Sequence, residues 1–180
     1  KWVKEAVDFG AIGVSYGLEY CPGIDIEEAL GITKEIQGRD DLLLAAHYRK
    51  DAKHALDSIN EMAYIGREAR IPFQISHLSS CSAFGNMKEA LDLIQDIRYK
   101  GTDIMVDAYP YDAFSTYIGS AVFDEGCFET WGKSYDAIML AEEPYKGVYC
   151  DKDIFEKVRK EYPNMLVVAY VMNEEEIIEA

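Results

Sequence analysis

Short runs of apolar residues alternate with longer amphipathic segments along this chain. Four apolar runs lie at residues 11–15, 42–46, 73–76 and 103–106. They are nearly continuous in apolar character and do not alternate with polar positions, which is typical of strands that are covered on both faces of a sheet. The pattern therefore predicts an α/β fold with buried parallel strands.

The segments between these runs have apolar residues at helical spacing. Residues 52–66 place alanine, leucine, isoleucine and methionine side chains on one face. Asp25 followed by Glu28, and Asn86 followed by Glu89, resemble capping boxes at the starts of two further helices. A helix is thus expected between each pair of successive strands, as parallel strands require.

The spacing of the strands suggests a particular α/β architecture. The residues that end or follow the four runs are Ser15, His47, His77 and Asp107, and they are separated by 32, 30 and 30 positions. A (β/α)8 TIM barrel of about 250 residues uses about 31 residues for each unit. We therefore expect about four parallel βα units of such a barrel, of the metal-dependent hydrolase type. A doubly wound open sheet has the same alternation and is the alternative, although the sequence lacks the glycine-rich motifs of its nucleotide-binding forms.

The strand and helix rhythm stops after about residue 120. Residues 124–133 are predicted to form a loop, and residues 137–141 and 166–170 are further strand candidates. We expect residues 1–120 to form the βα units of the barrel. Residues 121–180 are expected to form an excursion and the start of the following barrel segment within the same domain.

Composition and charge exclude several classes of function. The chain has 33 acidic and 18 basic residues, a formal net charge of -15, which disfavours nucleic acid and anionic membranes as partners. Its four cysteines form no CxxC pair, so we expect a reducing, cytoplasmic location. No apolar run approaches the ~20 residues of a membrane helix. The chain begins at Lys1 without an initiating methionine, and we expect it to be an internal piece of a longer protein.

Two of the three histidines occupy matching positions. His47 and His77 each follow directly on a predicted strand, one unit apart. Adjacent parallel strands would bring both imidazoles to the same rim of the sheet, within reach of one metal ion. The alternative is a pair of hydrogen-bonded core histidines. His54 is expected to be a packing or surface residue on the following helix.

Four segments resemble, in order, motifs of one enzyme family. They are residues 10–23 (GAxGxSxGLxYxPG), 46–49 (THxR), 74–78 (QISHL) and 107–116 (DxYPYxAxST). The family is the D-aminoacylase and N-acyl-D-amino-acid deacylase branch of the amidohydrolase superfamily. The resemblance implies a β/α barrel, one or two zinc ions, and hydrolysis of the amide bond of N-acyl-D-amino acids.

The resemblance also assigns metal ligands. It implies that His47 and His77 bind the zinc. A catalytic zinc normally has three protein ligands and a water. The family's HxH pair and ligand cysteine belong to segments before Lys1, its acid/base aspartate follows the region where the sequence stops, and none of the four cysteines matches that ligand. The site is therefore expected to be incomplete, and the chain alone to be inactive.

Other residues are assigned to the substrate. The resemblance places Tyr109 near the reacting centre, as a donor to the developing oxyanion or to the substrate carboxylate. Tyr20 and Arg49 are expected to contact the substrate or to orient ligands. The alternative for Arg49 is a simple ion pair with a carboxylate. The family usually has lysine where this chain has Ser79, and the change removes a charged partner of the substrate carboxylate, which favours a different or smaller substrate.

Two other functions share these sequence features. One is a non-catalytic interaction or structural module derived from the barrel, for which Ser79 is the best evidence. The other is an amidohydrolase that acts on another small or cyclic amide. The strands at the two ends of a partial barrel would have free edges, so we also expect a homo-oligomer.

Overall fold

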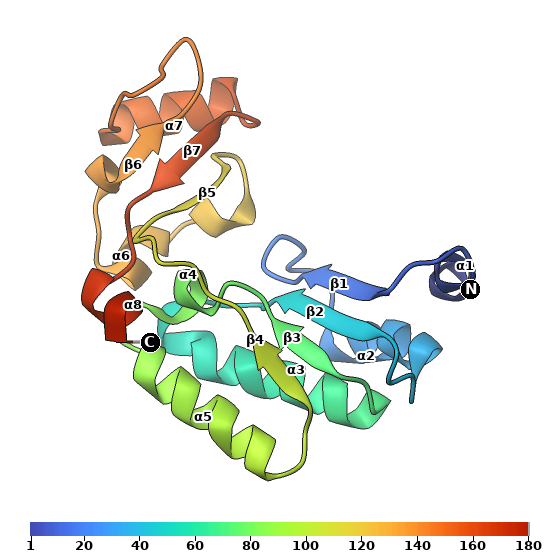
Figure 1. The fold of residues 1–180 in the computed structure, drawn as a ribbon. Coiled ribbons are helices and arrows are strands. Elements are labelled where there is room, and N and C mark those ends of the chain that lie inside the picture. The colour runs from blue at the N-terminus through green and yellow to red at the C-terminus, as the bar shows by residue number, and fades with distance from the viewer. Residues whose placement is uncertain (180) are drawn as a thin grey trace.

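The computed structural model describes residues 1–179, which form two parts with separate sheets (Figure 1). The first is a four-stranded parallel sheet in the order β1-β2-β3-β4, which confirms the predicted α/β class and the four parallel βα units. Its strands are β1 (Gly13–Gly17), β2 (Leu43–His47), β3 (Phe73–Ile75) and β4 (Ile104–Val106).

Helices cover one face of this sheet (Figure 1). They are α2 (Ile26–Thr33), α3 (Ala55–Ala69) and α5 (Met87–Tyr99); α1 (Trp2–Asp8) precedes β1, and the short α4 (Leu78–Ser82) follows β3. The buried positions of the strands, such as Leu44 and Phe73, pack in one core with these helices. The alternate positions in register, Ser15, Gln74 and Met105 among them, remain partly or fully exposed on the other face. Within residues 1–179 the sheet is therefore covered on one face, and the expectation of cover on both faces is wrong for this range.

The second part is a three-stranded antiparallel sheet with its own apolar core. It contains β5 (Phe114–Tyr117), β6 (Ile138–Leu140), β7 (Leu166–Ala169), α6 (Cys127–Trp131) and α7 (Lys152–Glu161). The strands expected near residues 137–141 and 166–170 are confirmed. The loop expected at residues 124–133 is wrong in part, because α6 forms there and buries Trp131.

The boundary expected at residue 120 separates β5 from its partners. β5 pairs with β7, so the second sheet draws on residues that precede residue 120. Whether both parts act as one domain stays a prediction. The outer edges of β1 and β4 have no partner strand within residues 1–179, and association through them also stays a prediction. No helix in this range is long and apolar enough to cross a membrane.

The two expected capping boxes have different outcomes. The Asp25 side chain accepts the backbone N–H of Glu28 at 2.8 Å and starts α2 as predicted. Asn86 precedes α5, but its side chain makes no cap hydrogen bond. Instead Glu176, from α8 (Glu174–Glu179), accepts the backbone N–H groups of Gly85 at 2.6 Å and Met87 at 3.4 Å. A carboxylate from a helix that is distant in sequence therefore accepts backbone N–H groups at the start of α5.

Replacing Glu176 by alanine is expected to lower the free energy of unfolding by about 1 kcal/mol. The loss of a side chain that caps a helix start typically costs about 0.5–2 kcal/mol, and the negative charge also favours the helix N-terminus. Urea denaturation measures the change. Glu175→Ala, on the same helix, is the matched control, and equal effects of the two substitutions would contradict the capping role.

Candidate metal centre

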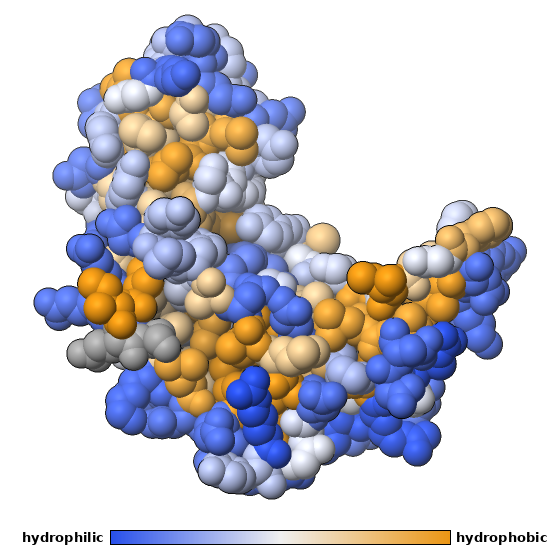
Figure 2. All heavy atoms as spheres, viewed as in Figure 1, coloured by the Kyte–Doolittle hydropathy of each residue, from blue (hydrophilic) through white to orange (hydrophobic). Residues whose placement is uncertain are grey.

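A cavity of about 380 Å³ lies where the carboxyl ends of β1 and β2 face the second part of the chain. The space-filling view shows the hollow between the two parts (Figure 2). Its lining comes from both parts: Glu19, Tyr20, His47, Asp51, His77, Ser80, Tyr109, Tyr111, Ala113, Phe114, Ser115 and Val122. Ligands of α/β proteins commonly bind at this end of a parallel sheet.

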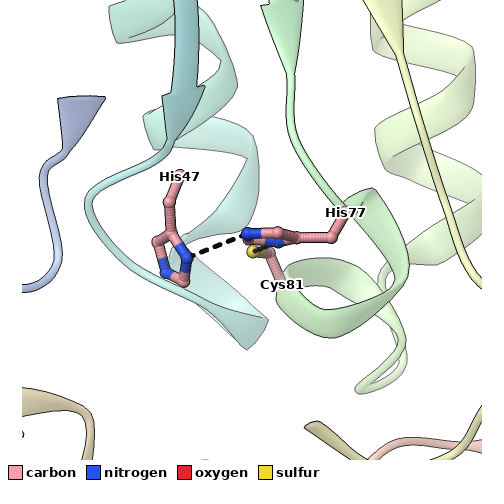
Figure 3. Close-up of side chains that lie close together, drawn as sticks. All are labelled: His47, His77 and Cys81. Atoms are coloured by element: carbon pink, nitrogen blue, oxygen red, sulfur yellow. Dashed lines mark hydrogen bonds between the residues drawn. The ribbon is translucent and has the colours of Figure 1, made fainter. Parts of the chain in front are cut away.

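The structure brings the two predicted ligand histidines together in this cavity (Figure 3). His47 is the last residue of β2, and His77 follows β3 and precedes α4. His47 Nδ1 lies 3.2 Å from His77 Nε2, and the two ring centroids are 4.7 Å apart. The expected convergence of the imidazoles at one rim of the sheet is therefore present.

The outer nitrogen of each imidazole has a partner that determines where its proton lies. His47 Nε2 lies 2.6 Å from a Glu19 carboxylate oxygen, which can only accept, so Nε2 carries the hydrogen. His77 Nδ1 lies 2.8 Å from Ser80 Oγ, whose own hydrogen is donated to the His77 carbonyl oxygen at 2.9 Å. The two facing nitrogens then both present lone pairs.

Two lone pairs at 3.2 Å repel each other unless a proton or a metal ion lies between them. A carboxylate or hydroxyl on the outer nitrogen is the usual arrangement around metal-bound histidines, because it holds the tautomer and the ring orientation. Burial, and then the neighbouring His47, lower the pKa of His77, which favours the neutral imidazole that binds metals. The donor set and its tautomers therefore fit a divalent metal such as zinc.

An unusual backbone conformation aims His77 into the cavity. Its φ of 38° lies in the left-handed region that side chains other than glycine rarely adopt. Asp107, which follows β4, holds this turn: its carboxylate accepts the His77 backbone N–H and the side-chain amide of Gln74, and its carbonyl oxygen accepts the Leu78 N–H at 2.8 Å. Asp107 thus contributes to the candidate metal centre by holding His77 in position.

Three further side chains that could hold a metal lie beside the histidines, and the sequence did not identify them. One ligand atom each from His47, His77 and Cys81 lies within 4.8 Å of the others, and the same is true of Glu19, His47 and Asp51. Asp51 and Cys81 each stand four positions after a predicted ligand histidine, a spacing that could have flagged them.

Asp51 is almost fully buried beside this cluster, and its Oδ1 has no hydrogen-bond partner within residues 1–179. Burial, and then the Glu19 carboxylate, raise the pKa of Asp51. An unpaired buried carboxyl is costly, because it has lost its contacts with water. Asp51 Oδ1 could therefore still accept a hydrogen bond or bind a metal ion at the edge of the candidate centre.

Two of the predicted substrate-binding residues are not brought to the cavity. The Arg49 guanidinium binds Glu61, with Nη2 2.7 Å from Oε1, and donates to the Ile24 carbonyl oxygen at 2.6 Å. Ser79 is fully buried, and its hydroxyl lies 3.3 Å from the carbonyl oxygen of Tyr109. Arg49 therefore links β2 to α3, and Ser79 holds the segment after β4; neither side chain faces the cavity in the described structure.

The two predicted tyrosines do line the cavity. The Tyr20 ring lies 4.9 Å from the His47 ring, and Tyr109 lies in the segment after β4. Burial raises the pKa of both hydroxyls, so both remain protonated near neutral pH and can donate hydrogen bonds. His54 is about half exposed at the end of a 3-10 turn (Ala52–His54), as expected for a surface residue.

Comparison with known proteins gives several relatives from Alcaligenes xylosoxydans. An N-acyl-D-aspartate deacylase is 32% identical over 140 residues, which are 74% of this chain and 28% of the relative. A D-aminoacylase is 34% identical over 119 residues, which are 64% of this chain and 24% of the relative. The chain therefore spans only about a quarter of the length of these relatives. No protein-family model matches it.

Solved structures resemble nearly the whole chain. A crystal structure of a D-aminoacylase, described as defining a novel subset of amidohydrolases, superposes with a TM-score of 0.78 at 24% identity over 97% of this chain and 37% of its own. An N-acyl-D-glutamate deacylase from Bordetella bronchiseptica, complexed with zinc and a phosphonate inhibitor, has a TM-score of 0.76 at 24% identity over 98% of this chain and 38% of its own. At this identity the likeness shows a shared fold.

Proposed function

We propose that this chain, which belongs to the D-aminoacylase family of amidohydrolases, carries part of a zinc site that hydrolyses the amide bond of N-acyl-D-amino acids. The observation that supports the proposal most is the pair of bare imidazole nitrogens of His47 and His77, 3.2 Å apart in a cavity. The zinc complex of the similar N-acyl-D-glutamate deacylase supports the choice of metal. One or two ions are proposed, since two groups of candidate ligands share His47.

The residues of the centre would have separate tasks. Zinc supplies polarisation of an amide carbonyl and acidification of water when it is bound. His47 and His77 would hold it, with Glu19 and Ser80 fixing the tautomers of the two rings. The Tyr109 hydroxyl, kept protonated by burial, would donate a hydrogen bond to the developing oxyanion or to the substrate carboxylate.

The lining of the cavity bears on the substrate. Its described residues include Glu19 and Asp51 but no lysine or arginine. We propose that hydroxyl groups bind the substrate carboxylate, since Ser79 offers no cation and does not face the cavity. A second negative charge on the substrate would meet Glu19, so neutral side chains are expected to be preferred over acidic ones.

The 180 residues alone are proposed to lack turnover, because they span about a quarter of the relatives that they match. The cytoplasmic location and the homo-oligomer likewise stay predictions. The net charge of -15 disfavours nucleic acid and anionic membranes as partners.

The test is release of free amino acid from N-acetyl-D-leucine by the zinc-loaded, complete product of the gene. We expect hydrolysis of the D but not the L enantiomer, slower hydrolysis of N-acetyl-D-glutamate, and no turnover by residues 1–180 alone. His47→Asn is expected to lower kcat/KM by at least about 1,000-fold, because the metal loses a ligand. A zinc-loaded product without activity on any N-acyl-D-amino acid would favour the non-catalytic module.

A further inference from the structure

A short turn of the second part forms one wall of the cavity. Val122 lies in this 3-10 turn (Ala121–Phe123), is 6% exposed and lines the same cavity as His47 and His77. We propose that Arg159, on α7, is a positioning residue that holds the turn in place, so that Val122 packs against an apolar group of the substrate. The inference rests on the proposed function, because it concerns how the substrate of that reaction is bound.

The Arg159 guanidinium binds both ends of the turn. Its Nη1 donates to the Phe123 carbonyl oxygen, and its Nη2 donates to the Ser120 carbonyl oxygen at 3.3 Å and to an Asp124 carboxylate oxygen at 2.5 Å. A planar guanidinium presents its donors in a fixed fork, which a lysine ammonium does not. The Arg159 side chain is 29% exposed, so these hydrogen bonds are shielded from water more than those of a surface ion pair.

α7 also holds the turn through the Phe123 ring. Phe155 lies four positions before Arg159, so both side chains leave the same face of α7. The ring centroids of Phe155 and Phe123 are 5.9 Å apart, and the Phe123 ring also packs against Trp131 at 5.9 Å. The turn is therefore held by its carbonyl groups and by an aromatic side chain, and α7 fixes a wall that it does not itself line among the described residues.

The turn has little internal support. Its hydrogen bonds within residues 120–124 are 3.0 and 3.1 Å long and join residues three positions apart. Such bonds have poorer geometry than those of an α-helix, so a single 3-10 turn depends on contacts with the rest of the protein. A second cavity, of about 810 Å³, lies on the Phe123 side of the turn. Without Arg159 the turn has room to move away, and Val122 then leaves the cavity wall.

The first test measures the kinetics of the zinc-loaded, complete product of the gene. Arg159→Ala is expected to raise KM for N-acetyl-D-leucine by about 10-fold, the lower end of what one methylene group in an apolar pocket contributes. The kcat and the zinc affinity should change little, because the lost contact binds the substrate and the transition state alike. N-acetyl-D-alanine is too short to reach Val122, and its KM should change little.

A double substitution tests whether Arg159 acts through Val122. Val122→Ala should reproduce the selective rise of KM for N-acetyl-D-leucine. The variant with both Arg159→Ala and Val122→Ala should be no worse than the poorer single variant, because both substitutions remove the same contact with the substrate. Effects that multiply would contradict the inference.

Hydrogen exchange of the peptide that contains residues 120–124 gives a measurement that needs no activity. Arg159→Ala should speed the exchange of these amides in the same complete protein. Arg159→Lys, which keeps a positive charge near Asp124 but loses the fork, should lie between Arg159→Ala and the wild type. Lys160→Ala is the matched control, since Lys160 is the next residue of α7 and is exposed; it should change neither exchange nor KM.

The outcomes separate this inference from the proposed function. Unchanged exchange in Arg159→Ala, or equal changes of KM for the two substrates, would overturn the inference and leave the proposed function standing. A wild-type product that hydrolyses neither substrate would refute the proposed function, and exchange would still decide whether Arg159 holds the turn. If Arg159→Ala does not fold, Arg159→Lys decides the question by the same two measurements.

Discussion

Replacing His47 or His77 by alanine is expected to weaken zinc binding by more than about 100-fold, and replacing both is expected to abolish stoichiometric binding. The reason is geometric: the facing nitrogens of the two rings lie 3.2 Å apart, and Glu19 and Ser80 hold both rings in the tautomer that leaves these nitrogens bare. The loss of one ring removes a direct ligand, which is a larger change than the loss of an outer partner, worth about 10- to 100-fold. Competition with a chromogenic chelator measures the affinity.

His54→Ala is the control for this experiment. His54 is about half exposed and is not part of either group of candidate ligands, so its removal should leave the zinc affinity unchanged. Glu19→Gln provides a graded test, because it keeps the size of the side chain but removes the carboxylate that faces His47; an intermediate loss of about 10- to 100-fold is expected. Wild-type affinity in both single histidine variants would contradict the assignment of the site.

Replacing Phe73 by alanine is expected to lower the free energy of unfolding by about 3–5 kcal/mol, a large fraction of the 5–15 kcal/mol that is typical of a folded domain. Phe73 is fully buried on the helix-covered face of β3, and a Cβ atom added at Gly66 of α3 would lie 2.5 Å from its ring. The ring therefore fills the space between strand and helix, and its removal leaves a cavity. Urea denaturation measures the loss, and Tyr99→Ala, at an exposed aromatic residue, is the control.

A double substitution tests the same contact from both sides. Gly66→Ala is expected to destabilise the wild type, because the added methyl group meets the Phe73 ring. In the Phe73→Ala background the methyl group has room, so Gly66→Ala should be neutral or stabilising. Additive effects of the two substitutions would show that α3 and β3 do not meet at this pair of residues.

The order of the elements in the first part could be predicted because it depends on local patterns. Apolar runs near residues 11–15, 42–46, 73–76 and 103–106 became the four parallel strands, because short apolar runs between amphipathic helices are a local signal of strands. The α2 cap at Asp25 could be predicted for the same reason. The cap of α5 could not, because its carboxylate comes from Glu176, about ninety residues away.

The candidate site likewise has features that the sequence could predict and features that it could not. The convergence of His47 and His77 follows from the parallel register of neighbouring strands, which spacing along the chain can reveal. The direction of each side chain does not follow from spacing. Arg49 was expected near the substrate, but Glu61 on α3 binds its guanidinium. The Ser79 hydroxyl contacts the Tyr109 carbonyl oxygen, whereas the hydroxyl of its neighbour Ser80 contacts the His77 ring.

The sequence by itself determined the α/β class, the parallel strands and the two histidines at their carboxyl ends, because the periods of strands and helices and the order of strands depend on residues close together in the chain. Only the tertiary structure decided that Glu19, Asp51 and Cys81 surround those histidines, and that a second sheet completes the wall of the cavity. These contacts depend on how a left-handed turn at His77 and the packing of distant segments aim individual side chains, and no local pattern encodes that direction.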